Sequence, residues 1–78
     1  MKIVVYTTRF CGYCSASVRL LRDLGYEFQQ IPVDQDPGLR RKLAAENQGY
    51  RRVPMIFIDD RFIGGYNELK ELHHKGQI

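Results

Sequence analysis

The sequence has few cysteines and prolines, no tryptophan and no long apolar run. It has no tryptophan, two cysteines and three prolines in 78 residues. Its uninterrupted apolar stretches are only a few residues long, too short to cross a bilayer as a helix. The N-terminus leads directly into a β-branched run without the pattern of a signal peptide. We therefore expect one small cytoplasmic domain, residues 1–78, with a single modest core.

Neither sign of charge dominates the chain. Lysine and arginine number 12 against 9 acidic residues, a formal net charge of +3. The basic residues are interleaved with acids, and the only clusters are residues 40–42 and the pair Arg51 and Arg52. Nucleic-acid binding needs a concentrated basic face with stacking aromatics. We expect neither nucleic acid nor membrane as a partner, and a monomer.

The two cysteines, Cys11 and Cys14, are separated by two residues and follow the β-branched run Ile3-Val4-Val5 at the start of a helix-patterned segment. A sulfur at a helix start lies beside unsatisfied N–H groups and the positive end of the helix dipole, which favour a thiolate. The second sulfur lies one turn inside and is close enough to attack a mixed disulfide on the first. The pattern predicts a redox pair.

Three other interpretations of the cysteines stay open at this point. A zinc site would need two more ligands, and the candidates His73 and His74 are adjacent, whereas zinc-binding histidines are usually spaced by three to five residues. A structural disulfide would close so short a loop that it would constrain the unfolded chain little. Two buried, unreactive thiols are the third alternative.

Hydrophobic periodicity predicts strands and helices in the order β-α-β-α-β-β-α. A right-handed β-α-β crossover followed by a hairpin gives an α/β fold, a mixed four-stranded sheet with three helices. The expected strands are residues 2–7, 26–33, 55–58 and 61–64, and the expected helices run from about 12 to 24, from 37 to about 47, and from about Asn67 to residues 73–76.

The first helix places the two cysteines differently. Cys14, Val18 and Leu21 form one apolar stripe, so Cys14 should face the core while Cys11 stands at the exposed helix head. In open sheets of this kind, sites form beyond the carboxyl ends of the strands and at helix N-termini. Cys11 falls at that place.

Three segments resemble the signatures of the glutaredoxins, in the same order and spacing: TTRFCGYC at 7–14, RVPMIFI at 52–58 and IGGYNEL at 63–69. The resemblance covers nearly the whole chain and is to the dithiol type, with a CGYC active site. It implies a thioredoxin-like fold. It also implies glutathione-dependent reduction of protein disulfides and protein–glutathione mixed disulfides, with Cys11 as nucleophile and Cys14 as resolving cysteine.

The resemblance also implies a glutathione site around a cis Val53–Pro54 bond. The Val53 backbone would pair with the cysteinyl part of glutathione, and the start of the last helix would hold its γ-glutamyl carboxylate. Asn67 is a good helix cap, and either it or Glu68 could accept a hydrogen bond from the ligand's ammonium group. The implied contacts are Arg9, Tyr13, Arg51, Arg52, Val53, Pro54, Gly65, Tyr66, Asn67 and Glu68.

The chain departs from the common glutaredoxin pattern at two positions. Thr8 stands where many relatives have lysine, and Arg9 or Arg51 would have to replace its charge. Gly12 stands where many have proline, and some relatives with glycine there hold a [2Fe-2S] cluster between two subunits through the first cysteine and glutathione. A cluster-binding dimer using Cys11 is therefore an alternative function. A thioredoxin-like electron donor, for instance to ribonucleotide reductase, is another.

Overall fold

The computed structural model describes residues 1–78 and contains four strands and three helices in the predicted order. The expected fold class is confirmed. The strands are β1 (Ile3–Thr7), β2 (Gln29–Pro32), β3 (Met55–Ile58) and β4 (Arg61–Gly64), and the helices are α1 (Gly12–Asp23), α2 (Pro37–Glu46) and α3 (Tyr66–His74).

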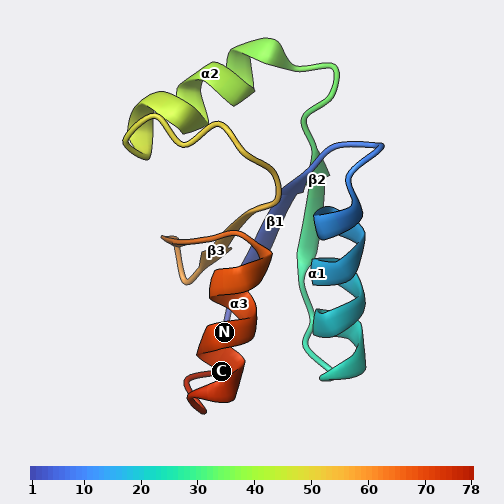
Figure 1. The fold of residues 1–78 in the computed structure, drawn as a ribbon. Helices are drawn as coiled ribbons and strands as arrows, with labels where there is room; N and C mark the ends of the chain where they lie inside the picture. The colour runs from blue at the N-terminus through green and yellow to red at the C-terminus, as the bar shows by residue number, and fades with distance from the viewer.

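The strands form one mixed sheet in the order β2-β1-β3-β4, with β1 in the interior (Figure 1). β1 pairs in parallel with β2, where Val5 lies opposite Gln30, and antiparallel with β3, where Val5 lies opposite Ile56. β3 and β4 form the expected antiparallel hairpin. The parallel pair requires α1 as a crossover, so the carboxyl end of β1 leads straight to the two cysteines.

The sheet buries side chains on both faces because successive residues of a strand point in opposite directions. One face carries the larger core, in which Val5 and Ile56 pack with Leu21 of α1 and Leu69 of α3. The other face carries a second cluster of Val33, Leu43 and Met55, with half-buried Tyr6, Leu39, Tyr50, Val53, Phe57 and Phe62 packed against it.

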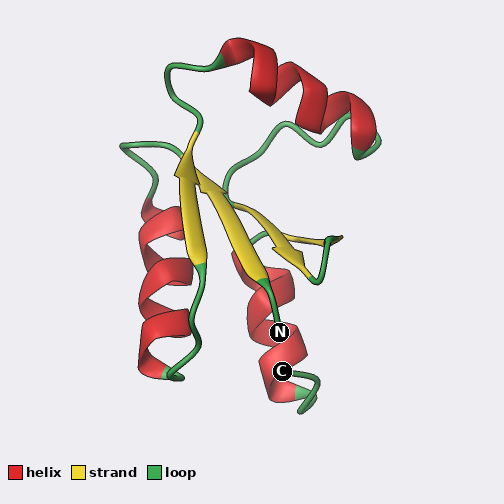
Figure 2. Ribbon diagram, turned by 180° about the vertical axis from the view of Figure 1, so that it is seen from behind, coloured by secondary structure: helices red, strands yellow, loops and turns green.

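The helices divide between these two cores. α1 and α3 run side by side and cover the first face, while α2 lies across the end of the sheet at which β1 and β2 finish (Figures 1 and 2). α2 begins at a well-capped terminus, because Asp36 accepts a hydrogen bond from the Leu39 N–H at 3.0 Å and Pro37 occupies the first helical position. None of the three helices has the length and apolar character needed to span a membrane.

The second expected strand was too long, and the expected cap of the last helix was wrong. The second strand is only Gln29–Pro32, because the Tyr26 N–H bonds back to the Leu21 carbonyl at 3.0 Å and closes the end of α1 instead of joining the sheet. α3 starts at Tyr66, one residue earlier than expected, and its N-cap is Gly65. Asn67 therefore lies inside the first turn and does not cap the helix.

Candidate active site

Cys11 is the N-cap of α1, with an extended backbone at φ −128° and ψ 110°. Its sulfur accepts a hydrogen bond from the Cys14 N–H at 3.1 Å and lies 3.6 Å from the carbonyl oxygen of Val53, to which a thiol proton can be donated. An N–H donor aimed at the sulfur stabilises negative charge on it. Cys11 is partly exposed, so this sulfur is open to a reaction partner.

Cys14 lies one turn into α1 and is 3% exposed, packed in the same stripe as Val18 and Leu21. The expected arrangement, Cys14 inward and Cys11 outward, is confirmed. Burial raises the pKa of the Cys14 thiol to about 12, and its hydrogen bond with Cys11 adds to that rise. The Cys14 thiol therefore stays protonated at neutral pH.

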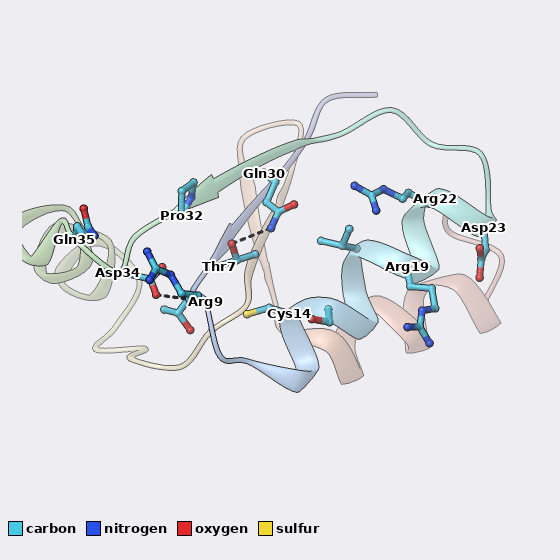
Figure 3. A pocket seen from close by; sticks show the side chains of 13 residues that line it. Thr7, Arg9, Cys14, Arg19, Arg22, Asp23, Gln30, Pro32, Asp34 and Gln35 are labelled. Atoms are coloured by element: carbon cyan, nitrogen blue, oxygen red, sulfur yellow. Dashed lines mark hydrogen bonds between the residues drawn. The ribbon is translucent and has the colours of Figure 1, made fainter.

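A polar cavity of about 660 Å³ lies between α1 and β2, and Cys14 forms part of its wall. Figure 3 shows Cys14 at the head of α1 with its sulfur toward Thr7 and Arg9. The Arg9 N–H donates to the Asp34 carboxylate at 2.6 Å, and this bond ties the loop before Cys11 to the end of β2. The glutaredoxin resemblance implied that Arg9 contacts glutathione, and in the structure Arg9 lines this cavity.

The loop before β3 approaches Cys11 through the Val53–Pro54 peptide bond, which is cis. Pro54 is buried, while Val53 is half-buried with its carbonyl toward the Cys11 sulfur. The Val53 N–H has no hydrogen-bond partner in the chain. An extended ligand lying along this loop would find one backbone donor and one acceptor beside the reactive sulfur.

A second cavity, about 190 Å³, opens beside this loop and the start of α3. It brings together eight of the ten residues that the sequence predicted for glutathione. Arg51 is not among them, because it lies in a separate groove beside α2. The walls of the 190 Å³ cavity are Tyr13, Tyr50, Arg52, Val53, Pro54, Gly65, Tyr66, Asn67 and Glu68.

Gly64 and Gly65 provide the space that this cavity and the turn into α3 require. A Cβ on Gly65 would lie 3.0 Å from the Tyr50 hydroxyl and 3.4 Å from the Pro54 carbonyl oxygen. Gly64 has φ +115°, a conformation that favours glycine, and a Cβ there would lie 2.7 Å from Cγ of Glu68. The Glu68 carboxylate folds back to accept a hydrogen bond from the Gly65 N–H at 2.8 Å. Glu68 thus caps α3.

Tyr50 is the cavity residue that the sequence reasoning missed. Burial, and then the charge of Glu68, raise the pKa of its hydroxyl, while Arg52 opposes the rise. The ring packs edge-on to Phe62, with centroids 4.9 Å apart, which holds the side chain at the cavity. The only sign of this role in the sequence is an aromatic residue four positions before Pro54. That sign does not place the Tyr50 side chain at the cavity unless the path of the loop is known.

Exposed aromatic side chains flank Cys11 on both sides. Phe10 is 95% exposed and Tyr13 is 63% exposed, and apart from Met1 they are the only large hydrophobic residues so exposed. Tyr13 also pairs with Tyr66 across the cavity, with ring centroids 6.0 Å apart.

The structure contains no group of three or more histidine, cysteine, aspartate or glutamate side chains that could hold a metal ion. His73 and His74 lie on α3. Iron–sulfur clusters usually take four cysteine ligands. A single copy of this chain, with two cysteines, does not supply a complete ligand set for one.

Comparison with known proteins agrees with this geometry. The glutaredoxin family model matches residues 3–63. A probable glutaredoxin of Synechocystis is 39% identical over 77 residues, 99% of this chain and 88% of the relative. A glutaredoxin of Pseudomonas aeruginosa is 38% identical over 76 residues, 97% of this chain and 89% of the relative. The crystal structure of a buckwheat glutaredoxin–glutathione complex superposes with a TM-score of 0.87 at 35% identity, covering 96% of this chain and 70% of that one. The chain therefore belongs to the glutaredoxin family, and its activity is that of a thiol–disulfide oxidoreductase.

Proposed function

We propose that the chain uses glutathione to reduce protein–glutathione mixed disulfides and protein disulfides, with Cys11 as the nucleophile and Cys14 as the resolving cysteine. The position of the Cys11 sulfur carries the proposal. Cys11 is partly exposed, and its sulfur accepts a hydrogen bond from the Cys14 N–H at 3.1 Å and lies 3.6 Å from the Val53 carbonyl oxygen. A cytoplasmic setting, where glutathione is abundant and thiols are kept reduced, suits this chemistry.

The 190 Å³ cavity has groups that match the parts of glutathione. The Val53 N–H and C=O can pair with the cysteinyl backbone, which brings the ligand sulfur toward Cys11. The first turn of α3 offers N–H groups to the γ-glutamyl carboxylate, and the exposed Asn67 side chain can accept from the ammonium group. Arg52 can meet the glycyl carboxylate. The buckwheat relative solved with glutathione supports this assignment.

The reaction begins when the Cys11 thiolate attacks the glutathione sulfur of a protein–glutathione disulfide. A new disulfide forms between Cys11 and glutathione, the old disulfide breaks, and the substrate leaves as a thiolate that takes up a proton. The protonated, buried Cys14 thiol does not compete for this attack, because its pKa lies near 12. Electrons therefore pass from the enzyme to the substrate through Cys11.

Two routes then restore Cys11. The thiolate of a second glutathione can attack the bound glutathione sulfur, which forms glutathione disulfide and releases the Cys11 thiolate. Alternatively, Cys14 loses its proton and attacks the Cys11 sulfur, which releases glutathione and forms a Cys11–Cys14 disulfide that two further glutathione molecules reduce. The second route also explains how a protein disulfide, which contains no glutathione, is reduced.

The electron source tests the proposal. Reduction of a glutathionylated peptide is measured through the oxidation of NADPH. One assay contains glutathione and glutathione reductase, and the other contains thioredoxin reductase alone. We expect turnover only in the first system. Asn67→Ala should raise the KM for the glutathionylated peptide several-fold with little change in kcat, and Asn47→Ala, an amide outside the 190 Å³ cavity, serves as the control. Turnover with thioredoxin reductase and none with glutathione would overturn the proposal.

A further inference from the structure

A basic groove lies along α2, separate from the 190 Å³ cavity and from the one that Cys14 lines. It has a volume of about 480 Å³ and is lined by three small residues, Ala44, Ala45 and Gly49, and by three arginines, Arg40, Arg41 and Arg51. On α2 the residue pairs 40/44 and 41/45 are each one turn apart, so arginines and small residues share one side of the helix. The groove has no acidic side chain in its lining.

The three arginines have no partner within the chain. The only ion pairs are Lys2 with Asp60 and Lys75 with Glu71, and no arginine side chain donates a hydrogen bond to another residue. Of the nearest carboxylates in sequence, Asp36 accepts the Leu39 N–H as the cap of α2, and Glu46 lines a neighbouring hollow and forms no ion pair with an arginine. Three exposed positive charges thus face one groove with nothing to offset them, an arrangement that attracts an anion.

One residue of the groove, Arg51, lies near the reactive sulfur. Arg51 is two residues before Val53, so their Cα atoms are at most about 7 Å apart. The Val53 carbonyl oxygen is 3.6 Å from the Cys11 sulfur. A chain attached at Cys11 therefore reaches the edge of the groove within roughly three to six extended residues.

The shape of the groove favours a peptide over a small anion. The start of α2 is a poor phosphate site, because Pro37 has no N–H and the Leu39 N–H already donates to the Asp36 cap at 3.0 Å. Charge in the groove comes only from three long side chains on two separate segments, with small residues between them. Several carboxylates spread along an extended chain fit this arrangement better than one compact phosphate does.

We propose that this groove binds an acidic segment of the protein substrate while the substrate's cysteine reacts at Cys11. The inference rests on the proposed function and adds a substrate class to it: proteins that carry glutamate or aspartate a few residues from the modified cysteine. Arg40 and Arg41 then act in recognition and not in the chemical step.

The test uses three glutathionylated peptides that differ only at positions three to six on either side of the cysteine, where they carry glutamate, glutamine or lysine. For the wild-type chain we expect kcat/KM to be about five-fold higher for the glutamate peptide than for the glutamine peptide, and lowest for the lysine peptide. In high salt the ratio of kcat/KM for the glutamate peptide to kcat/KM for the glutamine peptide should fall toward one, because exposed charges are screened. With R40Q/R41Q, the glutamate peptide should lose its advantage while the glutamine peptide reacts as before.

A matched control separates the groove from net charge. K42Q/R61Q also removes two positive charges, one of them from α2 itself, but neither Lys42 nor Arg61 lines the groove. This variant should keep most of the preference. A second readout needs no turnover: a fluorescent glutamate peptide with serine in place of cysteine should bind wild type more tightly than R40Q/R41Q in an anisotropy titration.

Each outcome decides between the two proposals. Reduction of all three peptides at equal rates, together with equal peptide binding by wild type and R40Q/R41Q, overturns the substrate class and leaves the glutathione chemistry standing. An equal loss of preference in R40Q/R41Q and K42Q/R61Q also overturns it, since net charge alone would then account for the effect. Groove-dependent binding of the glutamate peptide without reduction of any peptide supports the docking site and contradicts the proposed activity.

Discussion

The backbone N–H of Cys14 donates to the sulfur of Cys11 across 3.1 Å. The second cysteine therefore supports the first through its main chain, whereas its own side chain is buried beneath the helix head. The two roles of residue 14 can be separated by mutation, because a side-chain replacement removes the buried thiol and keeps the N–H donor.

Replacement of Cys14 by serine should leave the intrinsic reactivity of Cys11 nearly unchanged. The rate of Cys11 alkylation by iodoacetamide at pH 7, followed by mass spectrometry, should stay within about two-fold of wild type, since the donated hydrogen bond remains. Cys14→Pro, which removes the donor, should slow the reaction further. A ten-fold loss in the serine variant would mean that the Cys14 side chain, and not its backbone, controls the Cys11 sulfur.

Alkaline pH should destabilise the reduced protein through Cys14. In the unfolded chain this thiol ionises near its ordinary value of 9.0, whereas burial raises the folded pKa to about 12. Below about pH 9 the Cys14 thiol is protonated in both the folded and the unfolded chain, and its protonation does not favour unfolding. Above about pH 9 the thiol ionises in the unfolded chain but stays protonated in the folded chain, so the free energy of unfolding falls as the pH rises toward 12. Urea unfolding at about pH 8 and 10.5 should show a larger loss for wild type than for Cys14→Ser. Equal losses would contradict the assigned burial.

Glu68 should stabilise α3 through its hydrogen bond and not through its charge. Glu68→Gln keeps an oxygen that can accept from the Gly65 N–H, now 2.8 Å from the carboxylate. Glu68→Ala loses it, and we expect the alanine variant to lose about 1 kcal/mol of unfolding free energy and the glutamine variant much less. Urea denaturation measures both. Similar losses in the two variants would assign the effect to charge.

Gly64 should be far less tolerant of a side chain than another glycine with positive φ. Gly64→Ala combines a backbone at φ +115° with a Cβ 2.7 Å from Cγ of Glu68, while Gly76 has φ +70° and open space around it. We expect Gly76→Ala to cost about 1 kcal/mol and Gly64→Ala about 2–3 kcal/mol. Thermal unfolding compares them directly, and equal costs would show that the Glu68 side chain yields easily.

The element order and the inward position of Cys14 could be predicted because both depend on local periodicity. The stripe of Cys14, Val18 and Leu21 repeats at helical spacing, and such a stripe is buried wherever the helix packs. The three glutaredoxin-like segments contain the cysteines, Pro54 and the first turn of α3, and the structure brings these segments together around one cavity.

What the sequence did not predict depends on loops and tertiary contacts. Arg51 and Arg52 are adjacent in sequence, yet they line different hollows, because successive side chains of a non-helical segment point to different sides. Tyr50 reaches the cavity only through the path of the loop before β3. The start of α3 at Tyr66 follows from the bond between Glu68 and Gly65, which competes successfully with Asn67 as a cap.

The division of labour between Cys11 and Cys14 is the central claim, and one measurement tests it most directly. The rate at which glutathione is removed from a glutathionylated peptide, in the presence of excess glutathione, is compared for wild type, Cys14→Ser and Cys11→Ser. We predict that Cys14→Ser retains most of the wild-type rate, because the second glutathione can restore Cys11 without it, and that Cys11→Ser loses at least about 100-fold. Equal damage from the two substitutions, or activity that survives without Cys11, would contradict the account.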